Sequence, residues 1–140
     1  MKSKRTIIII IAVISIMLLA GFLTLRNNSL QENGIGPVKE LKLTDAIDGK
    51  LVASGKQIFD SKCGMCHMMN QCKVGPLMQG VTKRRKPEYI MNMIMNPVEM
   101  ASENSTAADL KSKYGMQMPN QNISQEEARA MLEYFRSYDK

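Results

Sequence analysis

The sequence predicts an all-α fold that is preceded by one N-terminal transmembrane helix. Residues 6–25 form an uncharged apolar run, residues 125–138 repeat apolar side chains at helical spacing, and no segment of useful length alternates apolar and polar residues. At 140 residues the chain is long enough for one domain with an appendage. We expect an anchor over residues 1–26, a flexible tether over residues 27–47 and one folded domain over residues 48–140.

The apolar run predicts a membrane anchor, because about 20 apolar residues cross the hydrocarbon core as a helix. Lys2, Lys4 and Arg5 precede the run and only Arg26 follows it closely, so the N-terminus is expected in the cytoplasm and the domain on the periplasmic or outer side. A cleaved signal peptide is the alternative. The run is longer than the usual signal core of about 7–15 residues and no small-x-small site ends it, which favours an uncleaved, single-pass protein of the cytoplasmic (inner) membrane.

The segment after the anchor is polar and contains Asn-Gly and Gly-Pro pairs, as a flexible linker does. Fully extended, residues 27–47 would reach about 70 Å. The formal net charge of the chain is +6, but residues 27–140 hold 15 basic and 13 acidic residues, a balance of only +2. This balance does not indicate nucleic-acid binding.

Two helices are predicted in the first half of the domain. One covers about residues 49–62, with Asp48 as its N-cap. The second runs over residues 87–96, because Pro87 suits the first helical position and Pro97 enforces a stop.

Two more helices are predicted towards the C-terminus. A short helix over residues 107–113 is expected to be capped by Ser105 or Thr106. The last helix covers about residues 125–138 and begins with a Ser-x-x-Glu capping box at Ser124.

The motif with the clearest chemistry is Cys63-Gly-Met-Cys66-His67. Cys-x-x-Cys-His is the attachment site of a c-type haem, in which each thiol adds to one vinyl group and the histidine ligates the iron. A thioredoxin-like redox pair and half of a zinc site share part of this spacing. The predicted export favours haem, because c-type haem is attached outside the cytoplasm. The third cysteine, Cys72, has no partner in the chain and is expected to be passive or to pair between chains.

Three further sequence motifs accompany Cys63-Gly-Met-Cys66-His67 along the chain. They are Gly55-x-x-x-Phe59-x-x-x-Cys63, Gly75-Pro76-Leu77-x-x-Gly80 and Met118-Pro119. With them, residues 51–138 resemble the small monohaem cytochrome c family of the class I type. The resemblance implies a cytochrome c fold of three to five helices wrapped around one covalently bound haem c. The segment over residues 98–116 is long for the smallest members of that family.

The resemblance also implies roles for individual residues. Gly55 would let the first and last helices cross closely, with Tyr134 as the aromatic partner of the crossing. The Pro76 carbonyl would accept a hydrogen bond from the proximal His67, which fixes the tautomer of a ligand histidine. Met118 would be the distal iron ligand, with Met116 as its nearest competitor among 13 methionines.

Contacts to the haem propionates are expected from Arg84, Arg85 and Tyr89. The basic run over residues 83–86 is also typical of a solvated charged surface, or of a docking patch for an acidic redox partner.

The function predicted from these residues is one-electron transfer rather than enzymatic catalysis, since His67 and Met118 would fill both axial positions. The expected partners are a respiratory donor complex and a terminal oxidase or reductase of a respiratory chain. One alternative is a haem-based gas sensor or enzyme module with a labile Met118. Another is a Cu(I)-binding protein, because cysteine, histidine and methionine are ligands that Cu(I) prefers.

Overall fold

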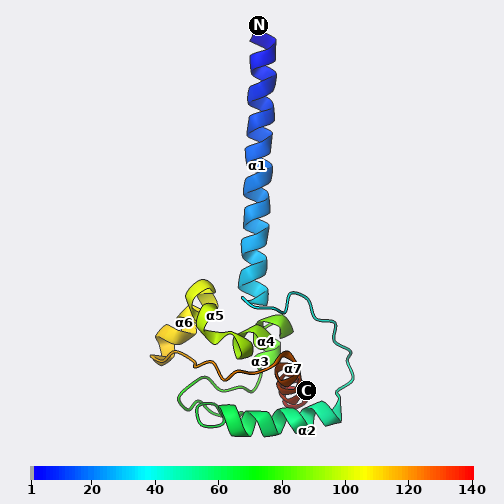
Figure 1. Ribbon diagram of the computed structural model, residues 1–140, viewed down its shortest axis with the longest axis vertical. Coiled ribbons are helices and arrows are strands. Elements are labelled where there is room, and N and C mark those ends of the chain that lie inside the picture. The colour runs from blue at the N-terminus through cyan, green and yellow to red at the C-terminus, as the bar shows by residue number, and fades with distance from the viewer. Residues whose placement is uncertain (1) are drawn as a thin grey trace. The chain divides into compact units, whose positions relative to one another are not determined.

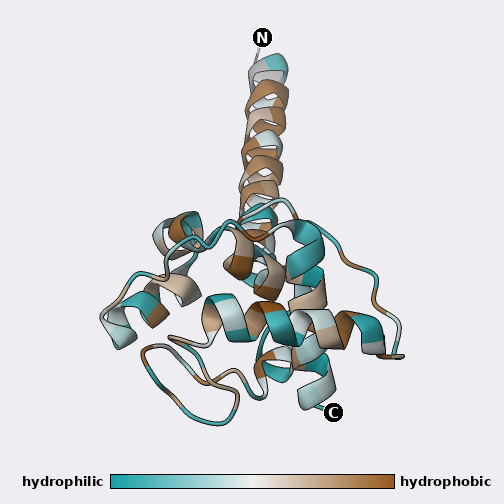
Figure 2. Cartoon of the chain, turned by 60° about the horizontal axis from the view of Figure 1, so that its bottom comes forward, coloured by the Kyte–Doolittle hydropathy of each residue, from teal (hydrophilic) through white to brown (hydrophobic). Residues whose placement is uncertain are grey.

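The computed structural model describes residues 2–140 and separates into two compact units, which divide between Leu30 and Gln31. Every regular element among the described residues is helical, so the predicted all-α class is confirmed. The first unit is formed by α1 (Lys2–Asn33) up to Leu30. Hydrophobic residues dominate this helix (Figure 2), and its large apolar side chains between Ile7 and Leu25 are exposed. From Thr6 onward this helix is long and apolar enough to cross a membrane or to act as a signal sequence.

The helix α1 extends beyond the predicted anchor and into the predicted tether. Residues 27–33 contain neither glycine nor proline, so nothing in them interrupts a helix. The helix ends before Gly34, whose φ of +79° is the left-handed conformation that glycine adopts readily after a helix. The expectation of a flexible tether over residues 27–47 is therefore wrong for residues 27–33, which are helical.

The second unit contains the remaining helices (Figure 1). They are α2 (Gly49–Ile58), the π-helical turn η1 (Phe59–Cys63), α3 (Val81–Arg84), α4 (Pro87–Met95), α5 (Pro97–Glu103), α6 (Ser105–Tyr114) and α7 (Gln125–Tyr138). The boundaries of α4 and α7 are close to those predicted. The Asp48 carboxylate accepts hydrogen bonds from Lys50 and Leu51, as expected of an N-cap, and the capping box of α7 is present.

Three details differ from the prediction. The first helix does not stay α-helical to residue 62, because η1 widens the last turn and Gly64 N–H donates to Phe59 O at 2.8 Å. Pro97 ends α4 but is also the first residue of α5, a position that suits proline. The N-cap of α6 is Asn104 rather than Ser105 or Thr106, since its side chain accepts the N–H of Ala107 at 3.1 Å.

The core of the second unit is the crossing of α2 and α7. Gly55 lies at the crossing, where a Cβ atom would overlap the carbonyl oxygen of Ala130. The Phe59 ring packs next to it, 5.7 Å from the ring centroids of both Tyr134 and Phe135. The expected glycine crossing with an aromatic contact is confirmed.

The rest of the predicted tether packs against the domain. Val38 is only 4% exposed, and its backbone N–H and carbonyl both bond to the side chain of Asn92, at 3.0 and 2.8 Å. Leu41 N–H donates to the Glu88 carboxylate at 2.8 Å. The apolar side chains of Val38, Leu41 and Leu43 join the core, so the folded unit begins near residue 31 and not at residue 48.

Replacing Gly55 with alanine tests the helix crossing. We expect Gly55→Ala to destabilise the protein by about 1–3 kcal/mol, because the new methyl group meets the backbone of α7 and the helices must separate. Thermal unfolding followed by circular dichroism measures the effect. Gly49→Ala is the matched control, since a Cβ at Gly49 meets nothing within 4 Å. Equal melting temperatures for the two variants would contradict a tight crossing.

Removal of the N-terminal segment tests whether residues 31–47 belong to the domain. A chain that begins at residue 48 loses the burial of Val38, worth about 1.5–3 kcal/mol. It also loses the hydrogen bonds of the Asn92 side chain to Asn33 and Val38, each worth about 0.5–1.5 kcal/mol. We therefore expect it to melt well below a chain that begins at residue 31. Identical melting curves would show that the segment is a passive linker.

Candidate haem site

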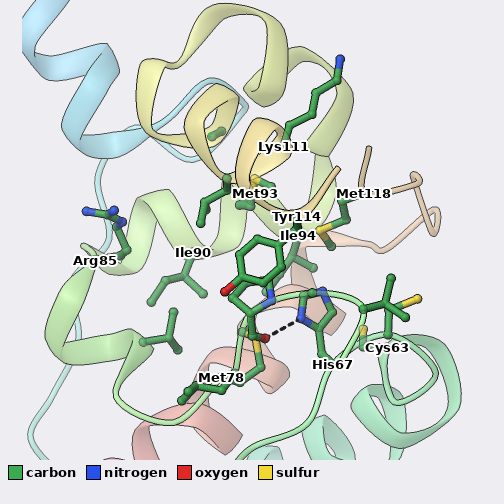
Figure 3. A pocket seen from close by; sticks show the side chains of 18 of the residues that line it. Cys63, His67, Met78, Arg85, Ile90, Met93, Ile94, Lys111, Tyr114 and Met118 are labelled. Carbon is green, nitrogen blue, oxygen red and sulfur yellow. Dashed lines mark hydrogen bonds between the residues drawn. The ribbon is translucent and has the colours of Figure 1, made fainter. Parts of the chain in front are cut away.

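A pocket in the second unit is lined by the residues that the sequence predicts to hold a haem (Figure 3). Its walls come from η1, residues 66–67 and 74–78, the helices α3, α4, α5 and α6, the segment over residues 116–119, and α7. Apolar side chains dominate the lining and include Phe59, Leu77, Met78, Ile90, Ile94, Leu110, Met131 and Phe135. Such a lining suits a large, flat, apolar cofactor with a few polar contacts.

The histidine of the motif is oriented by the backbone. A short turn after η1, in which Cys66 and His67 both donate N–H to Cys63 O, carries the imidazole into the pocket. His67 Nδ1 lies 3.0 Å from Pro76 O (Figure 3). A carbonyl only accepts, so Nδ1 carries the proton and Nε2 is left with a free lone pair. This is the arrangement of a histidine that is ready to ligate a metal.

Gly75 makes room for the imidazole. A Cβ atom at this position would lie 2.5 Å from His67 Cε1, closer than such atoms approach. The loop also returns to the motif, because Gly75 N–H donates to Cys66 O at 2.9 Å. Any side chain at residue 75 would therefore push the ring or the loop out of place.

The two thiols of the motif are free and line the same pocket. Burial raises the pKa of the Cys63 thiol, so it is neutral at pH 7. Its sulfur lies 4.0 Å from Met131 Sδ on α7. The third cysteine, Cys72, is exposed, and Sγ lies 3.8 Å from the hydroxyl of Tyr114.

The segment before α7 brings both candidate distal methionines to the pocket. Met118 is half-buried, whereas Met116 is 54% exposed. Figure 3 shows Met118 and His67 among the side chains that line the pocket. The side chain of Gln117 holds this segment, since Nε2 donates to Pro97 O and to Met118 O, both at 3.2 Å. The placement favours Met118 over Met116 as the residue that faces a cofactor.

The three candidate propionate contacts differ from one another. Tyr89 is 4% exposed and its hydroxyl has no hydrogen-bond partner within residues 2–140. Burial raises the pKa of this phenol, so it stays a donor. The Arg85 guanidinium lies over the Tyr89 ring, 5.4 Å from its centroid. Arg84 also lines the pocket, but its guanidinium donates to the backbone carbonyls of Leu77 and Gln79.

These observations fit a covalently attached haem. Cys63 and Cys66 would form the thioether bonds, and His67 Nε2 and Met118 Sδ would be the axial ligands. The unpartnered Tyr89 hydroxyl would find its acceptor in a propionate. Within residues 2–140, no three histidine, cysteine or carboxylate side chains gather as they would around a separately bound metal ion.

The sequence did not identify the wall that α6 contributes. Leu110, Lys111 and Tyr114 of this helix line the pocket, beside Met116 and Met118. Two features of the sequence pointed to this wall, the length of the segment over residues 98–116 and the presence of Gly115. This glycine ends α6 and has a φ of +66°. Spacing alone does not tell which face of such a helix turns inward.

Comparisons with known proteins agree with this site. The family model for cytochrome c matches residues 52–139. The cytochrome c from Rhodothermus marinus is 39% identical, with a TM-score of 0.75 over 79% of this chain and 95% of that chain. An engineered form of that cytochrome, bound to a carbene intermediate, is also 39% identical, with a TM-score of 0.72 over 79% and 96% of the two chains. The cytochrome c domain of a Pseudomonas putida protein is 28% identical, with a TM-score of 0.55 over 59% and 85%. No curated protein matches the chain.

Substitution of the two methionines tests the distal ligand. We expect Met118→Ala to abolish the weak absorption band of a methionine–iron bond and to lower the reduction potential, because a soft thioether favours ferrous iron. Met116→Ala should leave both unchanged, since Met116 is the more exposed. Visible spectra and redox titrations of the two purified variants measure this. The reverse pattern would assign the ligand to Met116.

Proposed function

The chain belongs to the cytochrome c family, and from this premise we propose that it is a membrane-tethered carrier of single electrons with one His/Met-ligated haem c. One observation carries the proposal above the others. His67 is bonded through Nδ1 to Pro76 O at 3.0 Å, within a pocket that Cys63, Cys66 and Met118 also line. This is a donor set for covalent haem attachment and for filling both axial positions.

The haem supplies the redox chemistry when it is bound, because its iron gains and loses one electron. The residues of the chain supply everything else. Cys63 and Cys66 would fix the position of the group, Pro76 holds the imidazole of His67 in one orientation, and Met118 would provide the soft ligand that raises the reduction potential. The mainly apolar walls would shield the bound group from water. No side chain is required to transfer a proton, so the proposal is an electron-transfer protein and not an enzyme.

The cellular setting is also part of the proposal. The apolar helix α1 and the basic residues that precede it support a single-pass anchor in the cytoplasmic membrane, with the haem domain on the periplasmic or outer side. An electron carrier in that position would take electrons from a respiratory donor complex and pass them to a terminal oxidase or reductase.

A second candidate function is ligand binding at the iron by a gas sensor or enzyme module. A similar protein, the engineered Rhodothermus marinus cytochrome, is bound to a carbene intermediate. In this chain such activity would require Met118 to dissociate. The segment that carries Met118 is held by the Gln117 side chain, which opposes that movement.

Carbon monoxide distinguishes the two functions. We expect the purified full-length holoprotein to titrate as one reversible one-electron couple and to show a low-spin reduced spectrum that carbon monoxide leaves unchanged. With both His67 and Met118 as ligands, the iron would offer no site to the gas. A high-spin reduced spectrum that shifts on addition of carbon monoxide would instead support the sensor or enzyme.

A further inference from the structure

We propose that Gln117 is a positioning residue that ties the segment carrying Met118 to the junction of α4 and α5, and that this tie limits how readily Met118 leaves the haem iron. The inference rests on the proposed function, since it takes Met118 as the distal ligand. It names the side chain that would keep the protein an electron carrier rather than a haem protein that binds external ligands.

The segment over residues 116–123 has little hydrogen bonding of its own. Within residues 2–140, no backbone–backbone hydrogen bond joins it to another part of the chain. Pro119 has no N–H to donate. The Asn122 N–H is used locally and donates to Asn120 Oδ1 at 2.8 Å. Ile123 is buried in the core and fixes the far end of the segment, so the part around Met118 depends on other contacts.

The Gln117 side chain supplies such a contact. Its Nε2 donates to Pro97 O and to Met118 O, both at 3.2 Å. A primary amide carries two N–H donors, so one nitrogen can serve two carbonyls. One carbonyl belongs to the ligand residue itself, and the other lies 20 residues before Gln117. Gln117 therefore bridges the ligand segment to a distant part of the fold.

The anchor at Pro97 is held firmly on its own side. The Pro97 side chain is fully buried where α4 ends and α5 begins. Asn96 N–H donates to Asn92 O at 2.8 Å, and Met100 N–H donates to Asn96 O at 3.1 Å. The Asn92 side chain is itself buried and bonded to Val38. A carbonyl placed in this way gives a fixed point for a segment with few bonds of its own.

No other side chain duplicates the bridge. Among residues 2–140, Gln117 makes the side-chain hydrogen bonds that reach the backbone of residues 116–119. Gln117 and Met118 both line the pocket and are both half-buried. Because water has limited access there, solvent would not fully replace the lost bonds.

The bridge affects ligand exchange through the movement that exchange requires. An external ligand binds only when Met118 moves away from the iron with its segment, and this movement breaks the bond from Gln117 to Pro97 O. The apparent affinity for an external ligand is the intrinsic affinity multiplied by the fraction of molecules with Met118 dissociated. Loss of the bridge raises that fraction, so it should raise the apparent affinity.

The test replaces Gln117 in the full-length holoprotein in detergent micelles. Gln117→Glu keeps the size of the side chain but replaces its two donors with acceptors. A carboxylate cannot bond to the carbonyl oxygens of Pro97 and Met118, so the variant breaks the bridge without opening a hole. Asn120→Asp is the matched control. It makes the same amide-to-carboxylate change in the same segment and keeps the acceptor for the Asn122 N–H.

Two readouts follow the ligand. The oxidised holoprotein is titrated with imidazole, at a pH above the pKa of imidazole, and loss of the weak methionine–iron band gives the half-saturating concentration. Proton NMR of the reduced holoprotein follows the methyl resonance of Met118, which reports the position of the side chain without an external ligand.

We expect Gln117→Glu to lower the half-saturating imidazole concentration about three- to tenfold and to shift the Met118 methyl resonance. Asn120→Asp should change neither quantity. Equal values for the wild type and Gln117→Glu would overturn the inference. Equal changes in the two variants would also overturn it, because the added charge alone would then explain them.

A measurement on the wild-type holoprotein separates the inference from its premise. The side-chain N–H signals of Gln117 should exchange with water more slowly than those of Gln125, which is exposed. Equal exchange would overturn the bridge even if Gln117→Glu does not fold. If the holoprotein shows no methionine–iron band, the proposed His/Met ligation fails and its effect on ligand exchange fails with it. The Gln117 signals then decide whether the bridge itself exists.

Discussion

The architecture of the second unit depends on the close approach of α2 and α7 at Gly55. Because this residue has no side chain, the backbone of one helix can reach Ala130 O of the other, and Phe59 fills the space beside the crossing against Tyr134 and Phe135. The next residues of the chain are η1 and the haem motif. A fixed crossing therefore fixes the wall of the pocket from which Cys63 and His67 act.

Backbone groups, more than side chains, orient the residues that face the pocket. Pro76 O holds the His67 ring, Gly75 leaves room for it, and the loop is tied to the chain after the motif by amide hydrogen bonds. Such contacts are short-range in sequence and lose little conformational freedom per bond formed. The Tyr89 hydroxyl is the exception, a buried donor without a partner in the described residues, to which a cofactor carboxylate would supply the acceptor.

Local chemistry made much of this structure predictable from sequence. The cap at Asp48, proline at the start of α4 and the capping box of α7 each depend on residues within one helical turn.

The packing of residues 31–43 was missed because Val38 is held by Asn92, which is 54 residues away. The cap of α6 and the wall that α6 forms were missed for similar reasons, since Asn104, Ser105 and Thr106 are all plausible caps and only tertiary packing selects one. Arg84 lines the pocket as expected of a cofactor contact, but its bonds to Leu77 O and Gln79 O could not be predicted, because charge alone does not show which acceptors a guanidinium reaches.

The central claim is that the chain holds its haem covalently through Cys63 and Cys66. Mass spectrometry of a protease digest of the full-length protein, isolated from cells with the haem-attachment machinery, tests it most directly. The account predicts that the peptide containing both cysteines and His67 carries the mass of one haem, and that the peptide containing Cys72 is unmodified. A peptide with two free thiols at residues 63 and 66, from protein made under those conditions, would contradict the account.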